Sequence, residues 1–255
     1  MYKWENLDYI TKEYTCLIAG VPGSGKSVLL DSLIYNFASE NVALYIIDLK
    51  RVQFNKWQGL PQLRRIAKDI DSALDLLDSF SDEMESRYRA MESTRAVKYT
   101  GQRAILIIDE MADLMTYKGV EKKLLHIMRL ARAANMSLYM ATQSPNRKVI
   151  TANIQNCCTS AVGLRCRSAI ESRQIIGMAG CEDLPKYGWG IMQTSDSEYL
   201  KIQIGMTSDE MIADAIKEVR AANGLDRPQP QTIPQPQNRT HGFFNVFKSL
   251  LGFAN

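Results

Sequence analysis

One segment constrains this chain more than any other: a glycine-rich loop that ends in a lysine and a serine, Gly20-Val21-Pro22-Gly23-Ser24-Gly25-Lys26-Ser27. In the pattern G-x-x-x-x-G-K-[ST] the glycines let the backbone bend around phosphate oxygens. The lysine reaches the β/γ-phosphates and the hydroxyl ligates Mg²⁺. An apolar run before the loop predicts a buried strand, and an amphipathic run after it predicts a helix whose N-terminus faces the phosphates. The sequence therefore predicts a site for a nucleoside triphosphate, which we take as ATP with Mg²⁺.

A second segment carries the acids that such chemistry needs. Residues 104–108 are a continuous aliphatic run, as expected of a strand buried on both faces, and Asp109 and Glu110 follow it directly. In enzymes with a phosphate-binding loop, an acid at this place holds Mg²⁺ and a neighbouring base orients the attacking water. Asp109 suits the first role and Glu110 the second. The alternative is that both acids only cap the short helix expected at 111–115. We favour ATP hydrolysis over passive binding.

The rest of the folded part alternates strands with helices, which predicts an α/β fold with a mainly parallel central sheet flanked by helices. A long amphipathic helix is expected near residues 70–91, and its apolar stripe is interpreted as core. The order of the strands in space does not follow from the pattern. Further strands are predicted at 15–19, 42–47, 137–141, 159–164, 190–193 and 199–205, and further helices at 28–34, 120–134 and 208–222.

Composition indicates one cytoplasmic domain. With 255 residues and 45% hydrophobic content, the chain has enough apolar side chains for a large core. The sequence has no apolar run near the roughly 20 residues that cross a bilayer, and no signal-peptide pattern. Its five cysteines are an odd number, which favours reduced thiols. A net charge of +3 is too small to indicate a nucleic-acid partner by itself.

The C-terminal part departs from this pattern. We divide the chain into a motor domain at 1–223, a linker at 224–242 and a short amphipathic segment at 243–255. Prolines alternate with glutamines in the linker, which is typical of an extended, semi-rigid tether. The last segment is rich in phenylalanine and leucine on one helical face, so we expect it to dock onto a protein partner or back onto its own domain. A weak membrane-surface anchor is a further alternative.

Several motifs together resemble the motor domain of the FtsK/SpoIIIE DNA translocases, within the wider FtsK–HerA group. The segments I-I-D-E-M-A-D-L-M at 107–115 and A-R-A-A-N at 131–135 are far more specific than the phosphate-binding loop. The resemblance covers about residues 15–215. Its other segments are 19–27, I-D-L-K at 47–50, E-M-E-S-R-Y at 83–88, A-T-Q at 141–143 and E-S-R-Q-I at 171–175.

The resemblance implies a RecA-like ATPase that forms a homo-oligomer, usually a hexameric ring, and pumps double-stranded DNA through its centre. It makes Arg132 the candidate that a neighbouring subunit inserts to stabilise charge on the transferred phosphoryl group. Gln143 matches the family's polar sensor of the γ-phosphate, and Arg173 matches an arginine that reaches the nucleotide or a subunit interface. More ordinary readings are a solvated helix face for Arg132 and a simple strand end for Gln143. Asp48 and Lys50 match a family feature whose role the sequence does not explain.

The loops that line the DNA channel in the family are more neutral here. Ser144 follows the A-T-Q segment where the family has a basic residue, and Gln155 stands where a lysine is expected. Arg147 and Lys148 lie between them and offer phosphate contacts instead, unless they form only a solvated basic turn.

Three functions follow from this sequence. The favoured one is a DNA translocase, serving conjugative or mobile-element transfer or genome packaging. The second is a secretion ATPase that acts on protein, which neutral pore loops would suit. The third is an ATP-binding switch that moves nothing. Stimulation of ATP hydrolysis by DNA separates the first from the others.

Overall fold

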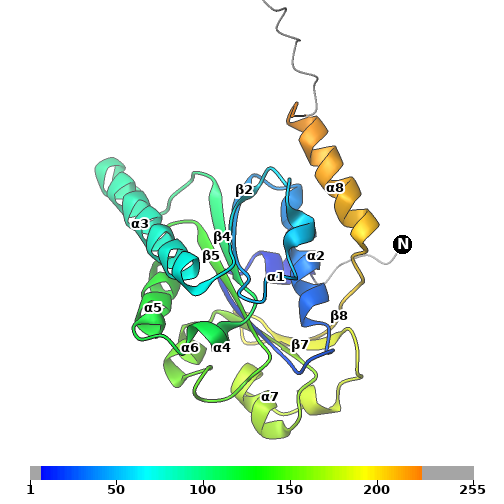
Figure 1. The fold of residues 1–255 in the computed structure, drawn as a ribbon. Coiled ribbons are helices and arrows are strands. Elements are labelled where there is room, and N and C mark those ends of the chain that lie inside the picture. The colour runs from blue at the N-terminus through cyan, green and yellow to red at the C-terminus, as the bar shows by residue number, and fades with distance from the viewer. Residues whose placement is uncertain (1–6, 226–255) are drawn as a thin grey trace, which may run out of the picture.

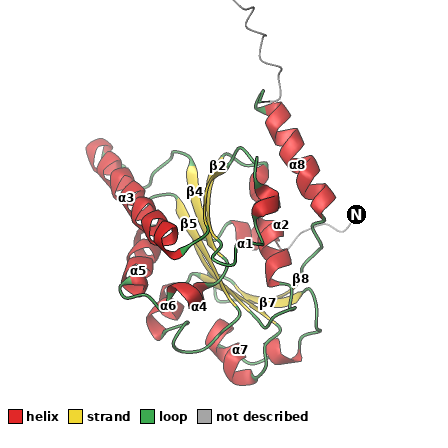
Figure 2. Cartoon of the chain, in the orientation of Figure 1, coloured by secondary structure: helices red, strands yellow, loops and turns green. Residues whose placement is uncertain are grey.

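A single eight-stranded sheet forms the centre of the computed structural model, which describes residues 7–225 (Figures 1 and 2). The first six strands in chain order, β1 to β6, all run parallel to one another. Strand β7 pairs antiparallel with both β6 and β8. This confirms the predicted α/β class with a mainly parallel sheet. In spatial order the strands are β3 (Leu63–Ala67), β2 (Val42–Ile47), β4 (Arg103–Ile108), β5 (Met136–Thr142), β1 (Thr15–Ala19), β6 (Ser160–Leu164), β7 (Trp189–Gln193) and β8 (Tyr199–Gln203).

Helices cover both faces of this sheet, with α3 and α5 on one side and α2 and α8 on the other (Figure 1). The long helix α3 begins at a capping box, in which Asp69 accepts from the Ser72 backbone N–H and the Ser72 hydroxyl accepts in return. The helices are α1 (Leu7–Thr11), α2 (Lys26–Ala38), α3 (Ile70–Thr94), α4 (Met111–Leu114), α5 (Val120–Leu130), α6 (Ala152–Cys157), α7 (Ala169–Ile176) and α8 (Asp209–Ala222), with 3-10 turns at Asn55–Trp57 and Cys181–Asp183.

Each face of the sheet has its own core because alternate strand residues point to opposite sides. In β4, Leu106 joins the cluster with Phe80 of α3, while Ile107 joins the cluster with Phe37 of α2. All of these side chains are fully or almost fully buried. Each contributes about 1.5–3 kcal/mol by leaving water. Packing on both faces therefore stabilises the central strands, and it positions the loops that follow their carboxyl ends.

The elements differ from the sequence prediction in a few places. Strand β3 was not predicted, since its two arginines interrupt the apolar pattern, as an edge strand tolerates. Helix α5 ends at Leu130 rather than near 134, because the chain turns before β5 and Asn135 takes a left-handed φ of 53°. Helices α6 and α7 also lie in stretches for which no helix was predicted.

The carboxyl ends of the parallel strands meet at one edge of the sheet. The phosphate-binding loop follows β1, Asp48 follows β2, Asp109 follows β4 and Thr142 ends β5. In open α/β sheets ligands bind at this edge. The fold thus brings together residues from four separate parts of the chain.

Other predictions concern segments at the margins. Most of the linker at 224–242 and all of the segment at 243–255 lie outside the described residues. Within residues 7–225, no helix is long and apolar enough to cross a membrane. All five cysteines are free thiols, and Cys16, Cys166 and Cys181 are buried.

Candidate nucleotide site

The phosphate-binding loop joins the buried strand β1 to helix α2, as the sequence predicts. Gly23 and Gly25 have φ values of 79° and 106°, which side chains with a Cβ rarely adopt. A Cβ on Gly20 would lie 2.7 Å from Leu164 Cβ, so this glycine lets the loop pass closely over β6. The loop therefore needs its glycines for conformation and for close packing, and it leads into the N-terminus of α2.

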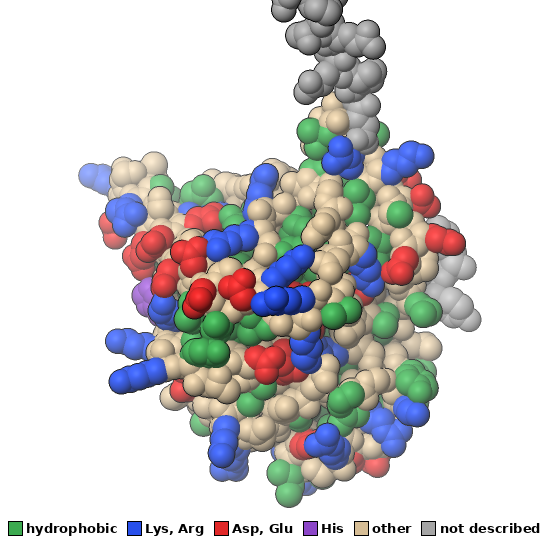
Figure 3. Space-filling view, viewed as in Figure 1, with side chains coloured by type: hydrophobic (Ala, Val, Ile, Leu, Met, Phe, Trp, Pro, Cys, Tyr) green, Lys and Arg blue, Asp and Glu red, His purple; other side chains and the backbone are tan. Residues whose placement is uncertain are grey.

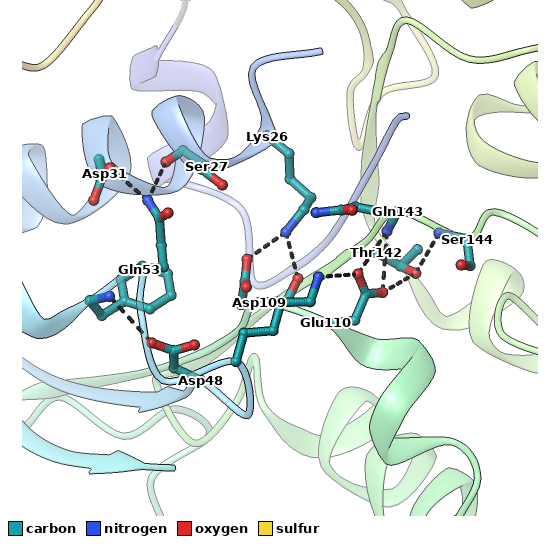
Figure 4. Close-up of polar contacts among 12 residues, drawn as sticks. Lys26, Ser27, Asp31, Asp48, Gln53, Asp109, Glu110, Thr142, Gln143 and Ser144 are labelled. Carbon is teal, nitrogen blue, oxygen red and sulfur yellow. Dashed lines mark hydrogen bonds and ion pairs between the residues drawn. The ribbon is translucent and has the colours of Figure 1, made fainter. Parts of the chain in front are cut away.

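Lys26 begins α2 and is almost completely buried. Its Nζ donates to Asp109 Oδ1 at 2.5 Å and to the Asp109 backbone oxygen at 2.7 Å (Figure 4). Asp109 is 4% exposed, so both charges have left water and each compensates the other. Such a pair is costly to break by removing one partner, because the other charge stays buried. The loop lysine and the acid after β4 are thus adjacent.

Glu110 is held by donors from two other parts of the chain (Figure 4). Its carboxylate accepts from the Thr142 hydroxyl at 2.6 Å and from the Gln143 backbone N–H at 3.2 Å. Lys50 Nζ lies 3.1 Å from Glu110 Oε2. Glu110 is the N-cap residue of α4, yet its side chain makes no capping hydrogen bond. The carboxylate points into the site, so side-chain capping does not explain this acid.

Lys50 belongs to a loop that is anchored beneath the site. Asp48 is fully buried, and its carboxylate accepts from the backbone N–H groups of Arg51 and Phe54. Farther along, Gln53 donates to Asp31 of α2 at 2.8 Å. This loop is therefore fixed at its start and against α2, which places Lys50 opposite Glu110.

Asp31 is the point where this loop meets α2. Its carboxylate also accepts from the indole N–H of Trp57 at 2.8 Å and pairs with Lys56. Burial raises the pKa of Asp31, while the bonds from Lys56 and Trp57 oppose that shift. The contact links the loop after β2 with the helix that starts at the phosphate-binding loop.

The residues present fit a nucleotide with a divalent cation. Ser24 Oγ, in the phosphate-binding loop, is buried without a hydrogen-bond partner in the described part of the chain. Such an atom calls for an explanation, and a ligand in the loop is one. Ser27 and Asp109 are the residues with hard oxygen atoms next to Lys26, as Mg²⁺ requires.

The remaining predicted site residues fall in different places. Gln143 is half-buried and lines the same cavity as Lys26. Arg147 and Lys148 are exposed in the loop after β5, at the edge that holds the phosphate-binding loop. Arg132 is exposed between α5 and the start of β5, hence at the opposite edge of the sheet, out of reach of Lys26 in the same chain.

Two further predicted positions lie beside α6 and α7. Arg173 is exposed on α7. Its backbone oxygen accepts from the side-chain amide of Gln155 at 3.2 Å. Gln155, which stands where the resemblance leads one to expect a lysine, thus has a contact within this domain.

Sequence reasoning missed two residues of the site. Lys50 and Thr142 were quoted as parts of motifs, but their contact with Glu110 was not foreseen. The signal available was that both follow or end a predicted parallel strand, as Asp109 does. Residues at such strand ends meet at one edge, so each was a candidate neighbour of the acids.

Comparison with known proteins agrees with this geometry. The sequence profile of the FtsK/SpoIIIE family matches residues 3–105. The DNA translocase FtsK of Staphylococcus aureus is 33% identical over 246 residues, which cover 84% of this chain and 31% of that protein. These matches confirm the resemblance to the FtsK/SpoIIIE family. The chain spans about a third of the length of this curated FtsK relative.

Solved structures show that the chain has a RecA-like fold with a phosphate-binding loop. The pCW3 conjugation coupling protein TcpA, in its monomer form with ATPγS, matches with a TM-score of 0.74 and 24% identity over 83% of this chain and 66% of that one. The cytoplasmic domain of the type VII secretion ATPase EccC of Thermomonospora curvata matches with a TM-score of 0.70 and 20% identity, over 80% of this chain and 28% of that one. At these identities the likeness concerns the fold.

Proposed function

We propose that this chain is an ATP-hydrolysing motor that moves double-stranded DNA, in conjugative or mobile-element transfer or in genome packaging. The observation that carries the proposal is the buried cluster at the carboxyl edge, in which Lys26 contacts Asp109 and Glu110 lies beside it. A binding-only protein needs the lysine but has no need of a second, separately held carboxylate. The 33% identity to a DNA translocase supports DNA as the substrate.

The site residues take these roles in the proposal. Lys26 and the backbone N–H groups of residues 20–27 bind the phosphates, and the incoming triphosphate competes with Asp109 for the Lys26 ammonium. Ser27 and Asp109 hold Mg²⁺, which supplies charge neutralisation at the phosphates when bound. Glu110 orients the attacking water and accepts its proton.

Three further groups complete the proposed reaction. Gln143, whose backbone already contacts Glu110, senses the γ-phosphate. Arg132 acts on the site of a neighbouring subunit, since it lies at the far edge of its own sheet, and Arg173 is the second candidate for this role. A hexameric ring supplies such neighbours. Positive charge close to the transferred phosphoryl group stabilises the transition state.

The outer parts of the chain serve the motor. Residues 1–223 form the motor domain, and residues 224–242 tether a segment at 243–255 that recruits a protein partner. Arg147 and Lys148 contact DNA phosphates, because both are exposed in the loop next to the nucleotide site. Arg147 and Lys148 are only a few residues from Gln143 in the same loop. We propose that this short distance couples ATP hydrolysis to movement of the DNA.

The proposal is tested by ATP turnover of the full chain with and without double-stranded DNA. We expect hydrolysis that DNA stimulates several-fold, and none from Lys26→Ala. Because Lys26→Ala leaves Asp109 buried without its partner, its thermal unfolding must be compared with wild type. An ATP hydrolysis rate that DNA does not change would favour a secretion ATPase. The exposed Ser144 is consistent with that alternative, because a neutral loop suits a protein substrate. ATP binding without hydrolysis would indicate a switch.

A further inference from the structure

Two of the five free thiols lie together beside the phosphate-binding loop. Cys166 follows β6 and Cys181 begins the 3-10 turn Cys181–Asp183. The Cys166 backbone N–H donates to the Cys181 backbone oxygen at 3.3 Å, and the Cys166 thiol is within hydrogen-bonding distance of the Cys181 sulfur. A disulfide needs Cα atoms about 4.4–6.8 Å apart, and a backbone hydrogen bond between two residues brings their Cα atoms about that close. The pair is therefore placed so that a bond between the two sulfur atoms can form.

The surroundings of Cys181 hold its thiol in this position. The Cys181 N–H donates to Ser172 Oγ of α7 at 3.1 Å. A Cβ on Gly163 of β6 would overlap Cys181 Sγ, so this glycine gives the thiol its place against the strand. In Figure 3 the surface around α7 mixes acidic, basic and apolar side chains. What distinguishes this region is therefore the pair of thiols beneath the surface.

The two thiols differ in acidity. The contact with Cys166 and the Ser172 hydroxyl lower the pKa of Cys181 and outweigh its burial. The same contact, together with burial, raises the pKa of Cys166. Because the thiolate is the form that attacks an oxidant, Cys181 is the nucleophile of the pair and Cys166 is the thiol that resolves the product.

Both side chains are buried, so an oxidant must reach them through a hollow in the surface. A cavity of about 410 Å³ is lined by Gly180 and Asp183, on either side of Cys181, and by Trp189 of β7. This space is far larger than the about 30 Å³ that one water molecule occupies. A small, uncharged oxidant of the peroxide class can therefore enter next to the segment that carries Cys181.

The strand end that carries Cys166 also supports the phosphate-binding loop. The Val21 N–H donates to the Arg165 backbone oxygen at 2.9 Å, and Arg165 directly precedes Cys166. The sulfur atoms of a disulfide are only about 2.05 Å apart, much closer than two thiols in contact. Closing the bond must therefore move at least one of the two segments. A shift of Cys166 carries Arg165 with it and disturbs its contact with Val21.

We propose that Cys166 and Cys181 form a peroxide-oxidation site whose disulfide weakens nucleotide binding at the adjacent loop. The Cys181 thiolate attacks one peroxide oxygen, the O–O bond breaks, and the leaving hydroxide takes up a proton to become water. The Cys166 thiol then attacks the sulfur of the resulting sulfenic acid, the S–O bond breaks, and a second water leaves with the Cys166 proton. The two thiols are oxidised to a disulfide and the peroxide is reduced to water. The effect on the nucleotide rests on the proposed function, since it requires that ATP binds at Lys26.

The oxidation is tested on the full chain by mass spectrometry after treatment with hydrogen peroxide. The intact chain should lose two hydrogen atoms, and digestion without reductant should give two peptides joined through Cys166 and Cys181. Dithiothreitol should separate them. Cys166→Ala and Cys181→Ala should each abolish this bridge. Cys158→Ala, which removes a half-buried thiol at the opposite end of β6, is the matched control and should leave it intact.

The effect on the loop is tested by calorimetric titration with MgATP. Oxidised wild type should bind MgATP about tenfold more weakly than reduced wild type, the order expected for one lost hydrogen bond, and reduction should restore the affinity. Cys166→Ala and Cys181→Ala should have the same affinity before and after peroxide treatment. Comparing each variant with its own reduced form removes any effect of the substitution on folding.

The outcomes separate this inference from the proposed function. Absence of the bridge, or a bridge between Cys157 and Cys158 in its place, would overturn the oxidation site. An unchanged MgATP affinity in the bridged protein would overturn its effect on the loop, and so would an equal loss in peroxide-treated Cys166→Ala. If reduced wild type bound no MgATP, the proposed nucleotide site would be wrong, while mass spectrometry would still show whether the disulfide forms.

Discussion

Lys50 Nζ lies 3.1 Å from Glu110 Oε2, although the two residues are 60 positions apart in the chain. Glu110 is 8% exposed, whereas the Lys50 side chain is 42% exposed. The lysine reaches from a loop at the rim of the site, and it shares the carboxylate with the Thr142 hydroxyl and the Gln143 N–H. Lys50 is therefore a positioning residue for the acid that we assign to the attacking water. Because the Lys50 ammonium remains open to solvent, we expect the pair to add little stability, so its effect belongs to orientation.

Replacing Lys50 by alanine should lower kcat for ATP by about tenfold or more, because a small misplacement of a catalytic group has a large effect on rate. The KM for ATP should change little, since Lys50 does not line the phosphate-binding loop. Steady-state ATPase measurements check both parameters. Lys50→Arg should restore part of the rate.

Lys68→Ala provides the matched control for this prediction. Lys68 donates to Asn55 in the same region but does not contact Glu110. A Lys50→Ala protein with the kcat of wild type would contradict the positioning role, as would an equal loss in Lys68→Ala.

The buried anchor of this loop should matter for stability. Asp48→Ala leaves the Arg51 and Phe54 N–H groups without their acceptor, and it should lower the free energy of unfolding by about 1–3 kcal/mol. Chemical denaturation measures the change. Asp75→Ala, which removes an exposed carboxylate paired with Arg65, should cost less than about 1 kcal/mol. Equal effects of the two substitutions would show that Asp48 is no anchor.

The local parts of this structure could be predicted from the sequence. The apolar run before the phosphate-binding loop matches β1, and the aliphatic run before Asp109 matches β4 to within one residue. These elements have strong periodic or continuous apolar patterns, and the patterns arise from burial that the fold then provides. The phosphate-binding loop itself is recognisable because few other sites need its glycines and lysine together.

The long-range parts could not be predicted. Lys50 meets Glu110 only because β2 lies next to β4, and no local pattern encodes the strand order. Arg132 precedes the strand predicted at 137–141, whereas Lys26 follows a strand, so only its place at the opposite edge could be inferred from a parallel sheet. Strand β3 was not predicted because its two arginines interrupt the apolar pattern by which strands are recognised in a sequence. Cys166 and Cys181 carry no motif, and only the folded chain brings them together beside the loop.

Arg132 should act in trans. Lys26→Ala subunits and Arg132→Ala subunits should each be inactive alone, and mixing them should restore part of the ATP turnover, because some interfaces then combine an intact loop with an intact arginine. Hydrolysis by wild type should rise steeply with protein concentration or on DNA. The measurement is the turnover of mixtures in several ratios.

Arg173→Ala is the comparison for this experiment, since Arg173 is the second candidate. Mixtures of folded, assembled Arg132→Ala and Lys26→Ala subunits that regain nothing would speak against Arg132. Recovery with Arg173→Ala in its place would transfer the role to α7.

Arg147 and Lys148 should contribute to DNA binding without reading sequence. Each phosphate contact releases counterions, so replacing both residues by alanine should flatten the log–log salt dependence of DNA binding by about two units. Affinity should fall alike for unrelated DNA sequences, and hydrolysis without DNA should stay near wild type. Fluorescence anisotropy at several salt concentrations gives the slope. An unchanged slope would exclude these two side chains from the DNA path.

The central claim is that hydrolysis at Glu110 moves double-stranded DNA, and displacement of a triplex-forming oligonucleotide from a DNA duplex tests it most directly. Wild type should displace the third strand when ATP is present and should not do so with a non-hydrolysable analogue. Glu110→Gln should still bind ATP, but it should lose turnover by about a hundredfold or more, as expected for a general base, and displace nothing. An unchanged third strand with wild type and ATP, under conditions in which ATP is turned over, would contradict the account.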